Sequence, residues 1–308
     1  IPACHARRMR AVVCSEFAPV DQLRVEERPD PEPGPDQVVV AVRAAGVNFV
    51  DALFVQGAYQ IKPPLPFTPG GEVAGEVVAV GRDVDGVAVG DRVLAMSWLG
   101  GFATHAVVPA RSVVPIPGDL TFGQAAGLAQ SYGTMLFSFT RRMQLRAGEW
   151  VLVLGAGGGI GLAAIDLAKH LGAKVIAAAS SPDKLEAATR AGADATIAYE
   201  AEDLKARARE LSGGGVDVVV DPVGGRFAEV ALRSLGWMGR YLVIGFAGGD
   251  IPSLPGNQVL LNNRTVVGID WGAWTMRDPD GNRLLLDDLM ALAAEGEIHP
   301  VEPTPYPL

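Results

Sequence analysis

The sequence has 308 residues, a formal net charge of −9, two cysteines, and 49% hydrophobic residues. This length predicts two domains, and the composition is that of an ordinary globular protein. The negative charge argues against a nucleic acid as partner, because the phosphate backbone would be repelled. The two cysteines, Cys4 and Cys14, allow neither a disulfide framework nor a metal-ligand spacing, which favours a reducing, cytoplasmic location.

No segment predicts a membrane span or a secretory signal. The uncharged window 120–140 contains several polar residues and three glycines, and the window 150–165 is short and interrupted by glycine. The segment 1–8 lacks the apolar core of a signal peptide, and we interpret it as an N-terminal extension ahead of Met9.

The first part of the chain, from Met9 to about Pro117, has a β-rich pattern. Short apolar runs separated by Pro and Gly predict strands at 10–14, 37–45, 73–80 and 91–95. The segment 29–37 is a turn-rich connector, because its prolines exclude a helix. The following segment 120–145 is expected to be helical and to lead into the second part of the chain.

The second part alternates strands and helices, which predicts a doubly wound parallel sheet in an α/β fold. Strands are expected at 150–154, 174–178, 193–199, 216–221, 239–246 and 264–270. Helices are expected from Ile160 onward and at 201–211. A last helix at 284–294 is expected to return to the first domain.

The turn between the strand 150–154 and its helix carries the most informative motif. It reads Ala156-x-Gly158-x-x-Gly161, a variant of the dinucleotide-binding fingerprint with alanine in the first position. Missing Cβ atoms let the backbone approach a pyrophosphate, whose charge is stabilised by the N–H groups of the helix start. We interpret the turn as a dinucleotide site, and a purely structural turn is the alternative. The expected contacts are Ala156, Gly157, Gly158, Gly159, Ile160 and Gly161.

The end of the strand 174–178 indicates which dinucleotide binds. An NAD site usually places a carboxylate here, whereas this chain has Ser180 and Ser181 and no carboxylate until Asp183. Ser181 suits a helix N-cap, and Lys184 follows in the first turn. Two hydroxyls, helix N–H groups and an ammonium group fit a 2′-phosphate, so we expect NADPH. A capped helix with a solvated lysine is the alternative.

Longer segments resemble the zinc-free, zeta-crystallin-like quinone oxidoreductases of the medium-chain dehydrogenase/reductase superfamily. The segments are AAGVNFVDALFVQGAYQIKPPLPFTPGGEVAGEVVAVG, GDRV and AGGGIG, and the resemblance covers nearly the whole chain from Met9. It implies a GroES-like catalytic domain, placed at 9–129 and 271–308, and a Rossmann NADP-binding domain at 130–270. It also implies a homodimer built through the nucleotide-binding domains. The family continues beyond Leu308, so the C-terminal part of the catalytic domain is expected to be incomplete here.

The residues also argue against zinc. By this resemblance, zinc relatives carry Cys where this chain has Asn48, and Gly-His-Glu where it has Gly70-Gly71-Glu72. Catalytic zinc needs three Cys, His or carboxylate ligands plus an open position, so too few ligands are left. No metal is expected, and Glu72 is interpreted as a buried, hydrogen-bonded carboxylate.

Without a Lewis acid, the acceptor needs a reduced form that is already stable. A quinone fits, because hydride addition gives an aromatic hydroquinone. The resemblance implies an NADPH:quinone reductase, with Asn48, Asp51 and Tyr59 on the acceptor side of the cleft. Asn48 is the expected donor to the acceptor oxygen and Tyr59 the expected proton donor, while for Asp51 capping of a helix at 52–56 is favoured. Reduction of an enone or 2-enoyl thioester, and NADPH binding without catalysis, are the alternatives.

Further cofactor contacts are implied by the resemblance alone. Those expected near the nicotinamide are Gln130, Tyr132, Thr134 and Asn263. Tyr199 is expected beside the adenine, and Gly245 and Phe246 at the carboxyl edge of the sheet.

Overall fold

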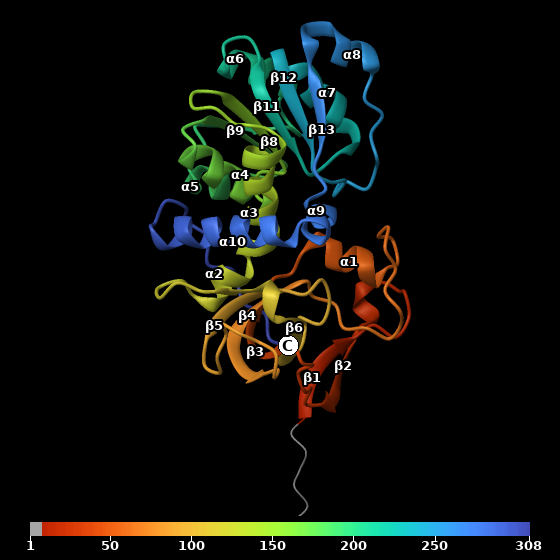
Figure 1. Ribbon diagram of the computed structural model, residues 1–308. Helices are drawn as coiled ribbons and strands as arrows, with labels where there is room; N and C mark the ends of the chain where they lie inside the picture. The colour runs from red at the N-terminus through yellow and green to blue at the C-terminus, as the bar shows by residue number, and fades with distance from the viewer. Residues whose placement is uncertain (1–7) are drawn as a thin grey trace, which may run out of the picture. The chain divides into compact units, whose positions relative to one another are not determined.

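The computed structural model describes residues 8–308, so the expected N-terminal extension lies outside the described residues except for Arg8. The chain divides into two compact units (Figure 1). Unit 1 contains the described residues up to Gln130, together with Leu286–Ala294 and Pro300–Leu308. Unit 2 contains Ser131–Leu285 and Glu295–His299.

Unit 1 is built on an antiparallel sheet of five strands in the order β6-β3-β4-β5-β7. Its strands are β3 (Gln37–Ala45), β4 (Glu72–Val80), β5 (Arg92–Met96), β6 (His105–Pro109) and β7 (Val113–Pro115). The inward residues are mostly valines, and Val38, Val40 and Val73 are completely buried, as β-branched side chains pack well on a pleated surface. A ribbon of β1 (Arg8–Val13) and β2 (Arg24–Pro29) pairs separately.

The helices of the first part differ in extent from the expectation. Unit 1 holds α1 (Phe49–Val55) and α2 (Phe122–Ala126), with 3-10 turns η1 (Val20–Gln22) and η2 (Ala110–Ser112). The single helical stretch expected at 120–145 is broken into α2, α3 (Leu128–Phe137) and the π-helical turn η3 (Ser138–Arg142). Thr121 caps α2 by accepting a hydrogen bond from Gln124 N, and Gly127 ends it.

Unit 2 contains a six-stranded parallel sheet in the order β10-β9-β8-β11-β12-β13, whose strands run side by side in Figure 1. The strands are β8 (Trp150–Leu154), β9 (Lys174–Ala179), β10 (Ala195–Ala198), β11 (Val216–Asp221), β12 (Leu235–Val243) and β13 (Thr265–Gly268). Strand order reverses between β8 and β11, which is the Rossmann arrangement and places helices on both faces. The predicted α/β fold class is confirmed.

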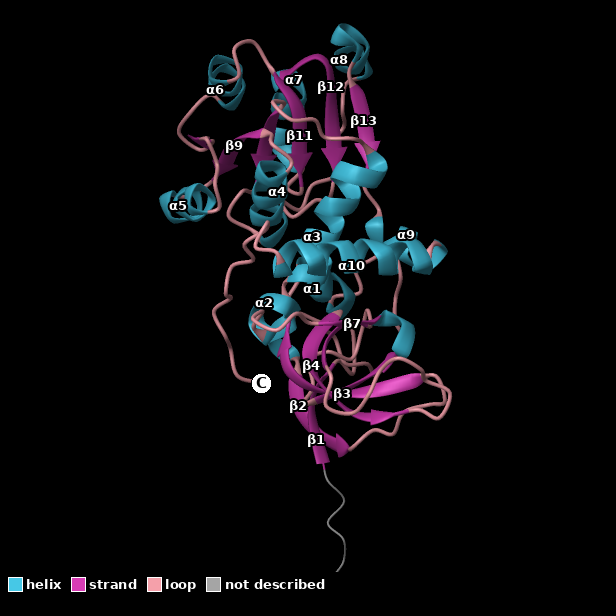
Figure 2. Cartoon of the chain, turned by 60° about the vertical axis from the view of Figure 1, so that its left-hand side comes forward, coloured by secondary structure: helices cyan, strands magenta, loops and turns pink. Residues whose placement is uncertain are grey.

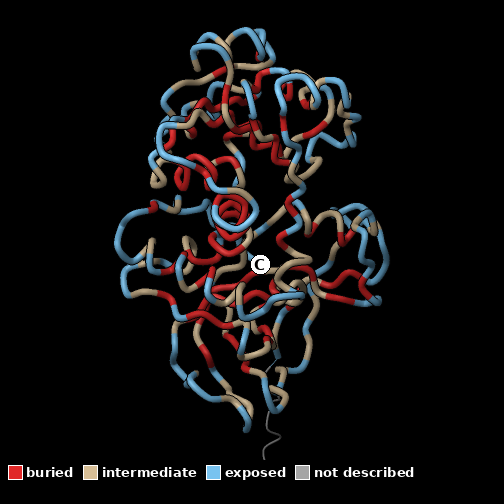
Figure 3. Tube along the Cα trace, turned by 45° about the horizontal axis from the view of Figure 1, so that its top comes forward, coloured by how far each residue is buried: buried red, intermediate tan, exposed pale blue. Residues whose placement is uncertain are grey.

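The helices of unit 2 pack in two groups (Figure 2). One group is α4 (Gly159–His170) with α5 (Pro182–Arg190), and the other is α6 (Leu204–Leu211) with α7 (Ala228–Ser234). The remaining elements of unit 2 are η4 (Gly225–Phe227), α8 (Gly256–Leu260), η5 (Leu261–Asn263) and α9 (Trp271–Arg277). Helix α10 (Pro279–Ala294) is divided between the units, and its residues from Leu286 onward belong to unit 1. The buried segments, red in Figure 3, include the central strands of the parallel sheet. Because these strands are buried on both faces, their sequences are apolar runs and do not alternate between apolar and polar residues. Across the described residues, no helix combines the length and apolar character that crossing a bilayer requires.

The two units differ from the expected domains at three places. Gln130, expected in the NADP-binding domain, belongs to unit 1, and 295–299, expected in the catalytic domain, belongs to unit 2. The segment 271–285, also expected in the catalytic domain, belongs to unit 2. The reason is aromatic packing on α3: the Trp274 ring stacks on Phe137 with centroids 4.7 Å apart, and a Cβ on Gly133 would lie 2.8 Å from the Trp271 ring.

Candidate functional site

The glycine turn of unit 2 has the geometry of a pyrophosphate site. A Cβ on Gly161 would lie 2.5 Å from the Gly155 carbonyl oxygen and 2.6 Å from Ala156 Cα, so only glycine permits this approach of helix to strand. Gly158 is the N-cap of α4 and leaves the first helical N–H groups available. A Cβ on Gly159 would lie 2.7 Å from Ser131 Oγ, a neighbour that the sequence did not indicate. These residues fit the pyrophosphate of a dinucleotide.

Lys184 lies directly against this turn. A Cβ on Gly157 would be 2.6 Å from Lys184 Cβ and 2.7 Å from its Cγ, so the lysine stem occupies the space that the glycine leaves. The lysine Nζ is 3.3 Å from Ser180 Oγ. Ser181 is the N-cap of α5, as predicted, with Pro182 following it. The structure therefore brings together the serine and the lysine that were expected to bind a 2′-phosphate.

An aromatic and cationic group lies next to Ser180. Burial raises the pKa of the Tyr199 phenol, which hydrogen-bonds to Ser180. The Tyr199 ring is 4.3 Å from that of Phe227, and the Arg226 guanidinium lies 4.7 Å above the Phe227 ring. Arg226 also pairs with Glu200 at 2.5 Å. Sequence reasoning missed Arg226 and Phe227, although both follow the carboxyl end of β11, where ligands of such sheets bind.

The α3 residues expected at the nicotinamide have other partners. The Tyr132 hydroxyl donates a hydrogen bond to Asp166 Oδ2 at 2.8 Å, and the same oxygen accepts the His299 backbone N–H at 2.6 Å. Tyr132 therefore ties α3 to α4, and its hydroxyl is already engaged. Burial raises its pKa, and the Asp166 charge adds to that effect. Thr134 is also buried, and its carbonyl accepts a hydrogen bond from Ser138 Oγ.

The other expected contacts in unit 2 divide between the two edges of the sheet. Gly245 and Phe246 follow the carboxyl end of β12, and Gly245 N donates to the Asp221 carbonyl. Asn263 instead precedes the amino end of β13. The strands are parallel and β13 has four residues, so Asn263 lies about 13 Å from the carboxyl edge. The structure does not bring Asn263 to the glycine turn, because its place before the strand puts it at the opposite edge.

In unit 1, Asn48 and Asp51 form the start of α1. Asn48 is the N-cap, and Asp51 Oδ2 accepts the Asn48 backbone N–H at 2.8 Å. The helix therefore begins at Phe49 rather than at 52, and Asp51 acts within its first turn. Asp51 is 4% exposed, and burial raises the pKa of its carboxyl to about 6, against the opposing effect of nearby backbone N–H groups.

Glu72, the first residue of β4, joins two of the expected site residues. Its Oε1 accepts a hydrogen bond from Asn48 Nδ2 at 2.7 Å, and its Oε2 accepts one from Gln130 N at 2.8 Å. Glu72 is 1% exposed. Burial raises the pKa of this carboxyl to about 7, and the charge of Asp51 acts in the same direction.

This donor set does not fit a catalytic zinc ion. Asn48 and Gly71 stand in two of the ligand positions, and both oxygens of Glu72 already accept hydrogen bonds. Within residues 8–308, no group of three or more His, Cys, Asp or Glu is placed to hold a metal ion.

Tyr59 lies in the loop after α1. Its half-buried ring packs on Phe54, with centroids 4.7 Å apart. Within the described residues its hydroxyl makes no hydrogen bond, so it is available to a ligand.

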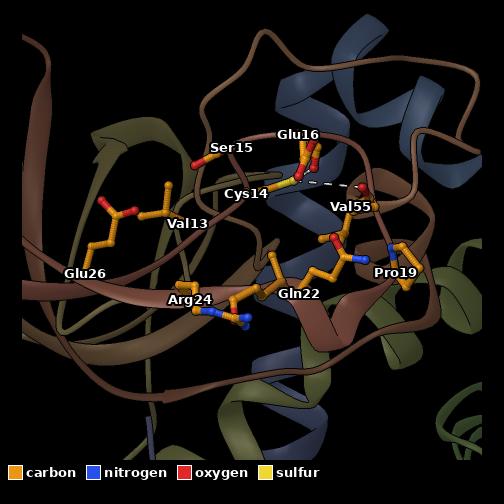
Figure 4. Close-up of a pocket in the computed structure, with 11 residues that line it drawn as sticks. Val13, Cys14, Ser15, Glu16, Pro19, Gln22, Arg24, Glu26 and Val55 are labelled. Carbon is orange, nitrogen blue, oxygen red and sulfur yellow. Dashed lines mark hydrogen bonds between the residues drawn. The ribbon is translucent and has the colours of Figure 1, made fainter.

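A small pocket of about 130 Å³ in the same unit lies beside Cys14 and contains none of the expected site residues (Figure 4). Burial raises the pKa of the Cys14 thiol, which argues against a reactive cysteine.

Two family models match the chain. The alcohol dehydrogenase GroES-like domain matches residues 34–118, and the zinc-binding dehydrogenase model matches residues 159–285. The chain is 42% identical over 293 residues to a quinone oxidoreductase-like protein 2 homolog of Nematostella vectensis, covering 94% of this chain and 80% of that protein. It is 40% identical over 296 residues to quinone oxidoreductase-like protein 2 of Mus musculus, covering 96% and 84%.

Solved structures are similar over almost the whole chain. A mycobacterial protein complexed with NADPH has a TM-score of 0.87 at 30% identity, covering 94% of this chain and 90% of that one. The quinone oxidoreductase of Escherichia coli complexed with NADPH has a TM-score of 0.85 at 27% identity, covering 94% and 89%. The CurK enoyl reductase has a TM-score of 0.85 at 25% identity, covering 96% and 91%.

Proposed function

Because the chain belongs to the zinc-free quinone oxidoreductase family of the medium-chain dehydrogenase/reductase superfamily, we propose that it reduces a quinone with NADPH. The observation that carries this proposal is the packing of Lys184 against the glycine turn, with its Nζ at Ser180 Oγ. The pair of Asn48 and Glu72 in unit 1 does not supply the ligands of a zinc ion.

The cofactor side lies in unit 2. NADPH, when bound, supplies a hydride. The N–H groups at the start of α4 bind the pyrophosphate, and Gly161 permits the close approach of backbone that this requires. Lys184 and Ser180 bind the 2′-phosphate, and the Tyr199–Phe227 pair stacks beside the adenine.

The acceptor side lies in unit 1. Asn48 Nδ2 uses one N–H for Glu72 and keeps a second N–H for the acceptor oxygen. A single neutral donor suffices for a quinone, since its two-electron reduced form is aromatic. The proton that completes the hydroquinone is taken from solvent, so no side chain has to supply it.

Reduction of an enone or an enoyl thioester is the second candidate. Tyr59 favours it, because a phenol without a hydrogen-bond partner can donate a proton to carbon after hydride addition. The similarity to an enoyl reductase gives further support.

The test is NADPH oxidation with purified protein against a panel of ortho- and para-quinones, enones and crotonyl thioester, with NADH as the control cofactor. The proposal expects quinones to give the highest kcat/KM and NADPH to be preferred over NADH. Higher kcat/KM with the thioester than with every quinone would favour enoyl thioester reduction over quinone reduction.

We also propose a homodimer built through β13. This strand lies at the end of the sheet with one neighbour, and Val266 in it is 37% exposed. Large apolar side chains are exposed on the adjoining segments, namely Trp237, Met238, Leu260 and Leu261. An exposed apolar edge strand favours pairing with another chain.

We also propose a reducing, cytoplasmic location, because the sequence has only two cysteines and no disulfide framework.

A further inference from the structure

Glu72 is a buried charged group to which the proposed function gives no role. A carboxylate at 1% exposure is costly unless its oxygens are hydrogen-bonded, and here both are. The two donors come from separate segments of unit 1: Asn48 precedes α1 and Gln130 lies in α3. Both donors are residues expected to contact the reactants.

The carboxylate determines how the Asn48 amide is turned. Above the raised pKa of about 7, the ionised Glu72 carboxylate accepts hydrogen bonds and donates none, so only the NH₂ end of Asn48 can face it. The bond of 2.7 Å is of the charge-assisted kind, and it leaves the second N–H and Oδ1 directed elsewhere. Asp51 holds the same residue by its backbone N–H at 2.8 Å. Asn48 is thereby fixed at two points.

The surroundings prevent the carboxylate from turning away. A Cβ on Gly46 would lie 2.3 Å from Glu72 Oε1 and 2.3 Å from the Ala126 carbonyl oxygen, so backbone packs directly against the carboxylate. The Gly46 N–H donates to the Glu72 carbonyl at 3.2 Å, which fixes the end of β3 to the start of β4. Backbone at the ends of β3 and α2 therefore lies directly against the Glu72 carboxylate and restricts its movement.

We propose that Glu72 is a positioning residue that orients the Asn48 side-chain amide toward the acceptor oxygen while anchoring the backbone at Gln130. This inference rests on the proposed function, because it assigns Asn48 to the acceptor. Glu72 touches neither reactant and acts through Asn48. In Glu72→Gln, the glutamine NH₂ group can face Asn48 and donate to its Oδ1. The Asn48 amide can then turn over, so that its NH₂ group no longer has a fixed orientation toward the acceptor oxygen.

A double-mutant cycle tests the proposal. Glu72→Gln and Asn48→Ala are made singly and together, and kcat/KM for the best quinone is measured at saturating NADPH and at a pH above about 8, where Glu72 is ionised. The matched control is Glu76→Gln, on the same strand, where the carboxylate pairs with Arg43 at 2.9 Å on the surface. NADPH affinity and thermal unfolding are measured for every variant. If Glu72→Gln does not fold, Glu72→Asp replaces it, since the shorter side chain keeps the charge but cannot reach both donors.

Glu72→Gln is expected to lower kcat/KM about 10- to 100-fold in the native background and less than about threefold in the Asn48→Ala background. NADPH affinity should change less than about threefold, and the Glu76→Gln control should match the native protein. Equal losses in both backgrounds, or a loss of NADPH affinity as large as that of kcat/KM, would overturn the proposal while leaving quinone reduction intact. A native protein that turns over no acceptor would instead refute the proposed function, and this inference with it.

Discussion

The side chain of Lys184 fills the space above Gly157, with its Cβ 2.6 Å from where a glycine Cβ would stand. The two residues come from successive strand–helix units: Gly157 follows β8, and Lys184 lies in α5 after β9. Their contact brings the ammonium group and the pyrophosphate turn to one edge of the sheet. The missing side chain at Gly157 thus leaves room for the lysine stem beside the turn.

Lys184→Ala should weaken NADPH binding by about 1.5–3 kcal/mol, the range for hydrogen bonds to charged groups, which corresponds to about 10- to 150-fold. NADH lacks the 2′-phosphate, so its affinity should change little. Titration calorimetry with both nucleotides measures this difference. Lys174→Ala is the matched control, because Lys174 begins β9 at the opposite edge and lies over Trp150. Unchanged NADPH affinity in Lys184→Ala would remove the assignment of the 2′-phosphate site.

Arg226 is expected to be the second cation of this site. Arg226→Ala should weaken NADPH binding about three- to tenfold, less than Lys184→Ala, because the guanidinium is 71% exposed and its ion pair is weakened by solvent. Glu200→Gln removes the competing carboxylate, so it should leave NADPH affinity unchanged or increase it. Both are measured with NADPH and 2′,5′-ADP. A Glu200→Gln variant that binds NADPH as weakly as Arg226→Ala would show that the pair is structural.

Much of the fold follows from local pattern. β3, β8 and β11 have the predicted bounds, because each contains a run of consecutive apolar residues, at 38–42, 150–154 and 218–220. β2 was missed because its sequence, RVEERP, is mostly charged and exposed, with Val25 as the one residue of an apolar pattern. β7 was missed because it has only three residues, and β6 because its apolar run is limited to three residues between His105 and Pro109.

The parts of the site whose residues follow one another along the chain were predictable, and the parts that strand pairing brings together were not. The glycine turn, Ser180 and Lys184 follow from their order along the chain. The bond between Asn48 and Glu72 depends on β3 pairing with β4, which no spacing shows. Asn263 precedes β13 and lies at the amino edge of the sheet, which its nearness to the strand in sequence does not show, and its contact with the nicotinamide stays a prediction.

Glu72 should make the stability of the protein depend on pH. Its pKa is raised from 4.5 to about 7 in the folded state, so between these values the folded state holds a proton that the unfolded state has released. Stability therefore falls as pH rises through this window, by an amount of about 3 kcal/mol. Glu72→Gln should lack this decrease, and urea unfolding at pH 4.5, 5.5, 6.5 and 7.5 measures it. Parallel curves for the variant and the native protein would contradict the assignment, and Glu76→Gln controls for loss of one charge.

Tyr59→Phe should separate the two candidate activities. The ring keeps its packing on Phe54, so unfolding should be unaffected and only the hydroxyl is lost. If the phenol protonates carbon, enone turnover should fall about 100-fold or more, the usual contribution of a positioned general acid. Quinone turnover should change less than about threefold, because the hydroquinone takes its proton from solvent. Equal loss on both acceptors would assign Tyr59 to binding rather than to proton transfer.

Val266→Lys should convert the proposed dimer to a monomer. A lysine on the outer strand of the sheet places a charge where a second β13 would pair, and such charges on edge strands block pairing in natural proteins. Light scattering coupled to size-exclusion chromatography measures the mass, expected at twice 32.2 kDa for the native chain and at 32.2 kDa for the variant. Val78→Lys is the control, because Val78 is 44% exposed on β4, which belongs to the other sheet, in unit 1. A native chain that elutes as a monomer, or a variant that remains dimeric, would place the interface elsewhere or exclude it.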